Sequence, residues 1–231
     1  LPAGHPEPPP TAPAVLNAWT LFQRGEFQQA ASAGLKAGGD GITAANKAIC
    51  IHATYLEKKE KVRLELFSEV AQRAEAQALR DPRNASAWYL HGYALGRYSQ
   101  AISVAKALAQ ELGGKVKDSL VRAIKLNPRH AEAHLALAAF HAEVIDKVGP
   151  LIGGMTYGAK CETGLKLFEE ALRLHPQWAI GLIEYANGLV MLEGESRMAE
   201  ATALYERAAA LQPAVAAGRL DGARGQAGPQ G

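Results

Sequence analysis

The apolar residues of this chain recur at helical spacing in segments that repeatedly end in a proline. Four such segments occupy residues 77–82, 122–128, 170–176 and 207–213. Each of the first three is followed by a new apolar stretch with helical spacing, at residues 85–95, 131–140 and 179–189. Proline disfavours helical geometry in the residue before it, so each proline predicts a helix end. The recurrence predicts stacked helical hairpins, which favours a solenoid with a binding function.

The N-terminal third shows the same helical periodicity in a fainter form. Residues 14–39 predict helix with a turn at Gly25, and the glycine-rich segment 35–41 breaks the chain. Further helices are expected at about 42–56 and 62–79, joined by a charged corner. No segment carries a useful strand signal, so we expect an all-α chain.

Composition changes near both ends divide the chain into three parts. Residues 1–13 are proline-rich and predict an extended tether. Residues 14–213 predict one helical domain with about four repeat units, and residues 214–231 predict a flexible tail. The sequence starts with Leu1 rather than methionine, and a proline-rich start often follows a cleaved secretory signal. We therefore expect a periplasmic or secreted protein, with a cytoplasmic one as the alternative.

The overall composition argues against several classes of protein. Apolar residues make up 48% and charged residues 21% of the chain, which excludes wholesale disorder. A net charge of +2 is too balanced to indicate a nucleic-acid partner. No apolar run reaches the roughly 18 residues of a transmembrane helix. The two cysteines, Cys50 and Cys161, have no metal-type spacing and are interpreted as small buried hydrophobic residues.

Small and large side chains recur at fixed distances after one proline and again at fixed distances before the next. Before Pro128 they are Trp88, His91, Gly92, Leu95, Leu120 and Ala123. Before Pro176 they are His134, Leu137, Ala138, His141, Gly164, Phe168 and Ala171. Before Pro213 they are Leu182, Tyr185, Ala186, Leu189, Ala201, Tyr205 and Ala208. This pattern resembles the tetratricopeptide repeat, which implies a right-handed superhelix of antiparallel helical hairpins. The resemblance covers residues 85–213 well and residues 14–82 loosely.

The spacing of the prolines departs from the regular repeat of about 34 residues. Successive prolines lie 46, 48 and 37 residues apart, which places two large insertions at 96–116 and 143–160. With these insertions the chain resembles the divergent repeat proteins of the regulator-of-microtubule-dynamics type, including their bacterial relatives. That group consists of binding or scaffold proteins, and microtubule association belongs to its eukaryotic branch. We expect the insertions to carry what is particular to this protein.

The resemblance implies a concave groove lined by the first helix of each hairpin. The groove residues are the second, fifth, ninth and thirteenth of each such helix. They are Ser86, Tyr89, Tyr93, Arg97, Glu132, Leu135, Ala139, Glu143, Ile180, Ile183, Asn187 and Met191. Tyrosine and arginine are common interface anchors, whereas isoleucine and methionine suit an apolar peptide or helix. The alternative is that Ile180, Ile183 and Met191 are covered by an adjacent helix or by the tail.

The sequence offers less support for a metal site, a phosphate-binding loop or a catalytic site. His130, His134 and His141 form a helical stripe that could hold zinc, but two of them occupy signature positions, which favours packing. Residues 149–156 have the glycine spacing of a phosphate-binding loop, yet Met155 stands where the essential lysine belongs. No nucleophile elbow or catalytic carboxylate pair stands out. We therefore expect no catalysis and no cofactor or metal.

The sequence thus favours a non-catalytic scaffold or adapter that binds a peptide, a helix or a partner protein in the concave groove. Homo-oligomerisation stays open. The alternative function is a periplasmic or lipid-anchored accessory component of a transport system. In that case the insertions would shape a pocket for a small ligand.

Overall fold

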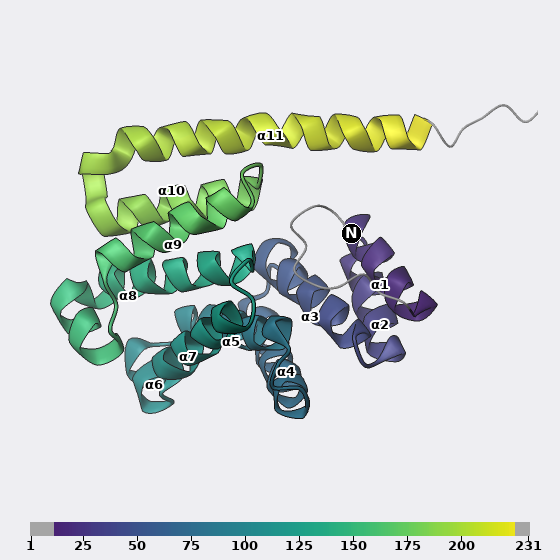
Figure 1. The fold of residues 1–231 in the computed structure, drawn as a ribbon, viewed down its shortest axis with the longest axis horizontal. Coiled ribbons are helices and arrows are strands. Elements are labelled where there is room, and N and C mark those ends of the chain that lie inside the picture. Colours follow the sequence, from purple (N-terminus) through teal and green to yellow (C-terminus); the bar gives the residue numbers. More distant parts are fainter. Residues whose placement is uncertain (1–11, 225–231) are drawn as a thin grey trace, which may run out of the picture. The chain divides into compact units, whose positions relative to one another are not determined.

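The computed structural model describes residues 12–224, with side chains up to Leu211, and consists of helices throughout that range (Figure 1). The helices are α1 (Pro13–Gln23), α2 (Phe27–Ala37), α3 (Gly41–Ile51), η1 (His52–Leu56), α4 (Glu60–Arg80), α5 (Ala85–Gln100), α6 (Val104–Ala109), α7 (Leu112–Leu126), α8 (Ala131–Tyr157), α9 (Cys161–Leu174), α10 (Ala179–Glu193), η2 (Gly194–Arg197) and α11 (Met198–Arg224). Within residues 12–224 no strand is present, so the predicted all-α fold class is confirmed. The chain forms two compact units, unit 1 up to Leu137 and unit 2 from Ala138.

The ends of the helices follow the prolines closely in three of the four repeats. Helix α4 ends at Arg80, directly before Asp81 and Pro82, and α7 and α9 end in the same way two residues before a proline. The next helix then starts with a local cap: the Asn84 side chain accepts a hydrogen bond from the Ala87 amide at 3.0 Å. These boundaries were predictable because they depend on neighbouring residues alone.

Unit 1 consists of three helical hairpins, α1–α2, α3–α4 and α5–α7, and of the start of α8. Small residues let their helices approach closely. A Cβ on Gly92 of α5 would lie 2.8 Å from Leu120 Cγ of α7, and a Cβ on Gly34 would collide with the Gly41 carbonyl. Helices α3 and α4 are also joined by a buried hydrogen bond of 3.1 Å from Gln77 Nε2 to Thr43 Oγ1.

Unit 2 contains the rest of α8 and helices α9, α10 and α11. Phe168 of α9 is fully buried and stacks on Tyr185 of α10, with ring centroids 5.2 Å apart. The ring of Phe168 also lies directly against Gly188, where a Cβ would collide with it. A glycine is required at this position because any larger residue would displace the aromatic ring.

The two insertions form helix rather than open loops. Insertion 96–116 contains the end of α5, the short α6 and the start of α7. Insertion 143–160 continues α8 beyond a kink at Gly149, whose φ of 81° is a left-handed value that favours glycine. Beyond the kink, Gly153 packs tightly, since a Cβ there would lie 3.0 Å from Val144 Cγ1. These two glycines therefore shape the insertion, one through the kink and the other through close packing.

One predicted helix end is absent. Helix α11 runs to Arg224 and includes Pro213, where the sequence predicts that the last helix stops. The residues that follow this proline include several alanines, the strongest helix formers, and no asparagine or glycine directly after it. The predicted tether at 1–13 and tail at 214–231 stay predictions: residues 1–11 and 225–231 lie outside the described residues, as do all side chains beyond Leu211.

Candidate partner-binding site

The predicted groove residues differ in how accessible they are. Three of them, Ser86, Tyr89 and Leu135, are buried, with exposed fractions of 6%, 7% and 7%. The partly exposed ones are Tyr93, Arg97, Glu132, Ala139, Glu143, Ile180, Ile183, Asn187 and Met191. The first group is therefore held inside the protein, and only the second can meet a partner without rearrangement.

In unit 1 the groove residues belong to a polar network that joins α3, α5 and the start of α8. Its members are Lys47, Thr54, Tyr89, Tyr93, Arg97, His130 and Glu132. Lys47 Nζ of α3 lies 3.0 Å from Glu132 Oε1, with the lysine side chain 6% exposed and the glutamate 29% exposed. The same ammonium lies 5.8 Å from the centroid of the Trp19 ring. Tyr89 stands between these helices, its ring centroid 4.8 Å from that of His130.

Burial keeps the network tyrosines and Cys50 in their neutral forms. Burial raises the pKa of Tyr89 well above its ordinary value, and the Glu132 charge adds to this effect. Burial also raises the pKa of Tyr93. The Cys50 thiol is 4% exposed, and its burial raises the pKa to about 12. Cys50 therefore behaves as the small buried hydrophobic residue that the sequence predicts.

Tyr93 connects this network to the end of α5. Its hydroxyl lies 3.0 Å from Thr54 Oγ1, which belongs to η1. Arg97 Nε donates to the same hydroxyl at 3.3 Å, and the guanidinium lies 5.4 Å from the centroid of the Tyr93 ring. Arg97 Nη1 also donates to Gln100 Oε1 at 3.3 Å. The arginine head group is thus held from two sides.

Arg97 lines a pocket of about 360 Å³ between the end of α5, the start of α4 and η1. The lining consists of Ala53, Thr54, Glu60, Arg63, Leu64, Phe67, Arg97, Gln100 and Ala101. Of these residues, only Arg97 is predicted from the sequence as a site residue. The others were missed because they come from three separate segments, and the only signal was the charged corner before α4.

Element η1 is a π-helix, a wide turn that holds one residue more than an α-helical turn. The Glu57 amide donates to the His52 carbonyl at 2.9 Å, five residues earlier. This turn places Ala53 and Thr54 in the pocket lining. Single π-turns are frequent at functional sites. The sequence predicts only a helix here, because the spacing of apolar residues does not distinguish the two turns.

Unit 2 places its predicted groove residues on α8 and α10. Ile180, Ile183 and Met191 are partly exposed, so neither full burial nor full exposure applies to them. The Asn187 side chain accepts a hydrogen bond from the Tyr205 hydroxyl of α11. Asn187 is therefore already used to join α10 to α11.

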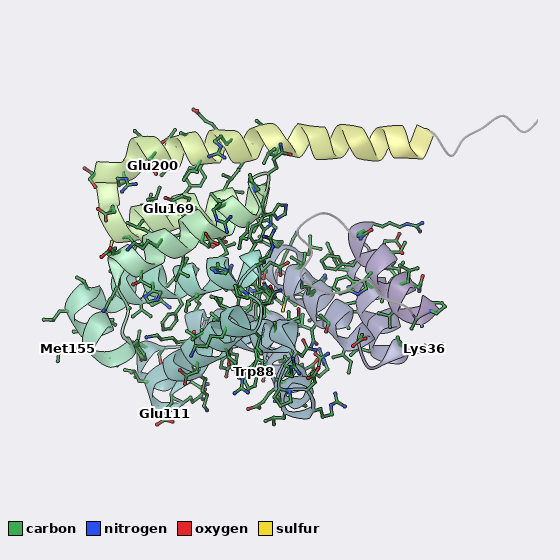
Figure 2. The ribbon with its side chains drawn as sticks, in the orientation of Figure 1. Lys36, Trp88, Glu111, Met155, Glu169 and Glu200 are labelled. Carbon is green, nitrogen blue, oxygen red and sulfur yellow. The ribbon has the colours of Figure 1, made fainter. Side chains whose placement is uncertain are left out.

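The most exposed large apolar side chains lie outside the predicted groove residues. Figure 2 shows Met155 at the surface of the α8 extension, where Leu151 and Met155 are 74% and 81% exposed.

Trp88, at the start of α5, donates from Nε1 to the Pro82 carbonyl at 3.1 Å, and the Arg122 guanidinium lies 4.5 Å from the centroid of its ring. Trp88 thus stabilises the turn before α5.

The three striped histidines have separate structural roles. His130 Nδ1 accepts from the Ala133 amide at 3.1 Å, at the start of α8, and His134 Nδ1 donates to the His130 carbonyl at 2.9 Å. His141 Nδ1 accepts from the Lys160 amide at 3.0 Å. All three are buried, as the packing interpretation expects. In the described part of the chain, no three histidine, cysteine or acidic side chains are grouped to hold a metal ion.

Cys161 is not paired with Cys50 and, contrary to the prediction, is only partly buried. Its thiol donates to Glu193 Oε1 at 3.1 Å, and desolvation together with this hydrogen bond raises its pKa to about 11. Among the described helices, none is both long and apolar enough to span a membrane.

The fold is similar to that of solved repeat proteins. No family model matches the sequence, and no curated protein matches it. The structure of TTC0263, a tetratricopeptide-repeat protein of Thermus thermophilus, aligns with a TM-score of 0.62 and 16% identity, over 87% of this chain and 90% of that one. MamA aligns with a TM-score of 0.45 and 16% identity, over 86% and 96%.

YrrB, described as a repeat protein with an unusual peptide-binding site, aligns with a TM-score of 0.41 and 17% identity, over 88% of this chain and 87% of that one.

The finer resemblance to the regulator-of-microtubule-dynamics type stays a prediction. The helical hairpins, the close-packed glycines and the likeness to TTC0263 together identify the fold. The chain is a divergent protein of the tetratricopeptide-repeat fold.

Proposed function

We propose that the chain is a non-catalytic scaffold that binds a peptide, a helix or a partner protein through the partly exposed groove residues. The observation that carries this proposal is the position of Arg97. It is a predicted groove residue, it is held in place by Tyr93, and it lines an open pocket. Solenoids of this fold expose such faces for binding rather than for chemistry.

The physical basis is preorganisation. A free arginine loses side-chain entropy when it is immobilised by a partner, about 0.5–1.5 kcal/mol for a rotamer-rich side chain. Arg97 is already restrained by Tyr93 and Gln100, so part of that cost is met before binding. Arginine and tyrosine are also among the side chains that most often dominate the energy of protein interfaces.

A second candidate function is the binding of a small ligand by an accessory component of a transport system. Arg97, Gln100 and Ala101 all belong to the insertion 96–116 and line the pocket, which is the arrangement that this alternative requires. We propose a periplasmic or secreted location for either function, with a cytoplasmic one as the alternative.

Quantitative capture experiments test the scaffold function. Proteins captured by the wild-type chain would be compared with those captured by Arg97→Ala and Ile183→Asp, with Arg80→Ala as the matched control. Arg80 is exposed at the end of α4 and lies outside the pocket. We expect the groove variants to lose specific partners that the control retains. Capture profiles that are the same for all four proteins would contradict the proposal.

The small-ligand alternative has its own measurement. Native mass spectrometry of the protein purified without denaturation would detect a stoichiometric small molecule if this function is correct. The spectrum of Arg97→Ala would then lack that added mass. A wild-type spectrum with the bare protein mass would contradict the alternative and leave the scaffold function unaffected.

A further inference from the structure

The pocket of unit 1 has an unbalanced charge. Its lining holds two guanidinium groups, Arg63 and Arg97, and one carboxylate, Glu60, which is exposed. Within residues 12–211 the Arg63 side chain makes no hydrogen bond or ion pair, although it is only partly exposed. An arginine beside a second cation is stabilised when an anion lies near both of them.

The same pocket has an apolar side. Ala53 and Phe67 are buried, and Leu64 lies one helical turn before Phe67 on α4. An inorganic anion alone would leave this apolar surface in contact with water. A ligand that carries a carboxylate next to an apolar group would satisfy both halves. A planar carboxylate also matches the fork of donors that an arginine presents.

The polar side of the pocket is positioned before any ligand arrives. Thr54 of the π-turn contacts the Tyr93 hydroxyl, and that hydroxyl accepts from Arg97. The chain of contacts from π-turn to arginine therefore fixes one guanidinium at the pocket wall. Arg63 belongs to α4, the second helix of the preceding hairpin, so a bound carboxylate would join helices of two different hairpins.

The rim of the pocket allows a longer chain to enter. Glu60 and Ala101 are both exposed, so the pocket is open to solvent on their side. A volume of about 360 Å³ is at the lower end of the range for ligand pockets and suits one or two side chains rather than a large ligand. The remainder of a peptide would lie outside it.

We propose that this pocket binds the carboxylate of an acidic residue, together with a neighbouring apolar side chain, from a partner peptide. This inference rests on the proposed scaffold function and names the chemistry of the partner at one point of its surface. Arg97 and Arg63 bind the carboxylate, and the surface formed by Ala53, Leu64 and Phe67 receives the apolar side chain. Tyr93 acts as a positioning residue for Arg97.

The test uses the full chain and three defined probes. The first is acetyl-Leu-Glu-Phe-amide, the second is the same peptide with glutamine in place of glutamate, and the third is free hexanoate. Calorimetry measures the affinity, and the arginine Nε–H resonances in NMR spectra report on Arg63 and Arg97. We expect the glutamate peptide to shift both resonances and to bind about tenfold more tightly than the glutamine peptide.

Variants separate the contact from the fold. Arg63→Gln is expected to weaken binding of the glutamate peptide about tenfold, and Arg63→Lys, which keeps the charge but loses the fork, to weaken it less. Arg80→Gln is the matched control on the same helix and should bind like wild type. Tyr93→Phe should move the Arg97 resonance and lower affinity while the Arg63 resonance still shifts with peptide.

Three results would overturn the inference: absence of binding by the glutamate peptide, equal affinity of the two peptides, or hexanoate affinity equal to that of the glutamate peptide. The last result would assign the pocket to a free small acid. The capture experiments distinguish failure of the carboxylate inference from failure of the scaffold function. If Arg63→Gln captures partners as wild type does, the carboxylate inference is wrong and the scaffold function stands. If capture is insensitive to Arg97→Ala and Ile183→Asp, the scaffold function itself is wrong.

Discussion

The polar network of unit 1 and the α9–α10 pair of unit 2 both join neighbouring helices but use different chemistry. In unit 1, an ion pair between Lys47 and Glu132 and the hydrogen bonds of Tyr93 connect helices of different hairpins. In unit 2, Phe168 is stacked on Tyr185 and fitted against Gly188. Close apolar packing is sensitive to changes of side-chain volume, whereas a polar network is sensitive to the loss of a hydrogen-bonding partner.

The difference has a functional meaning. Polar groups that hold each other at the edge of a pocket can also bind a ligand, which is the role proposed for Arg97. A stacked aromatic pair that is fully covered offers nothing to a partner. Under the proposed function, the polar network would therefore couple stability to binding, whereas the aromatic pair would contribute to stability.

The largest effect is expected in unit 2. Phe168→Ala would remove a side chain with no exposed surface and leave a cavity beside Gly188. We expect a loss of about 3–5 kcal/mol in the free energy of unfolding. Urea denaturation followed by circular dichroism measures it, with the exposed neighbour Glu169→Ala as the control. A loss no larger than that of the control would break the comparison.

Removing one tyrosine hydroxyl from each unit tests the comparison between the units. Tyr93→Phe removes the partner of both Thr54 and Arg97, and we expect it to cost about 0.5–1.5 kcal/mol of stability. Tyr185→Phe keeps the ring that stacks on Phe168 and should leave the unfolding free energy nearly unchanged. Denaturation of both variants in parallel gives the difference. Equal losses would show that the hydroxyl of Tyr93 has no special role.

The smallest effect concerns pH and lies in unit 1 at His91. Its Nδ1 lies 2.8 Å from Ser119 Oγ. Burial lowers the pKa of His91 below its ordinary 6.5, the Lys115 charge acts in the same direction and the Glu75 charge opposes it. The unfolded chain therefore takes up this proton first, so the stabilising contribution is complete above pH 6.5 and is lost as the pH falls toward the folded pKa.

His91→Gln tests this sign. We expect the wild-type free energy of unfolding to decrease more steeply below the ordinary histidine pKa of 6.5 than that of the variant, because glutamine does not titrate. Denaturant midpoints measured at several pH values between neutral and mildly acidic conditions give the two slopes. Parallel slopes for the two proteins would contradict the assignment.

Much of the fold could be predicted because the signals are local. Asp81, Asn127 and His175 each precede a proline, and the helices end just before them. The turn at Gly25 separates α1 from α2 where expected, with a φ of 78°. The helix through Pro213 was not predicted, because one proline competes there with a run of helix-forming alanines.

Less of the candidate site than of the fold could be predicted from the sequence. Arg97 could be named from its place in the repeat, but in the sequence Arg63 is one more charged residue on a helix surface. The two line the same pocket only because α4 and α5 are packed side by side, and helix packing distances are set by tertiary contacts rather than by periodicity. Burial of Ser86 and Tyr89 was likewise hidden, since the repeat pattern assigns a helix face and not its coverage.

Because residues 52–56 form a π-turn, the number of residues in this segment determines where its side chains lie relative to the pocket. A homologous chain with one residue fewer there could continue as regular α-helix, so its backbone would still be well formed. The remaining residues of the turn, up to the helix end at Leu56, would however change position around the helix axis. The side chain at the place of Thr54 would then leave Tyr93. Natural variants that differ by this single deletion would keep the architecture and lose the pocket, which makes chain length, rather than residue identity, the trait to compare among relatives.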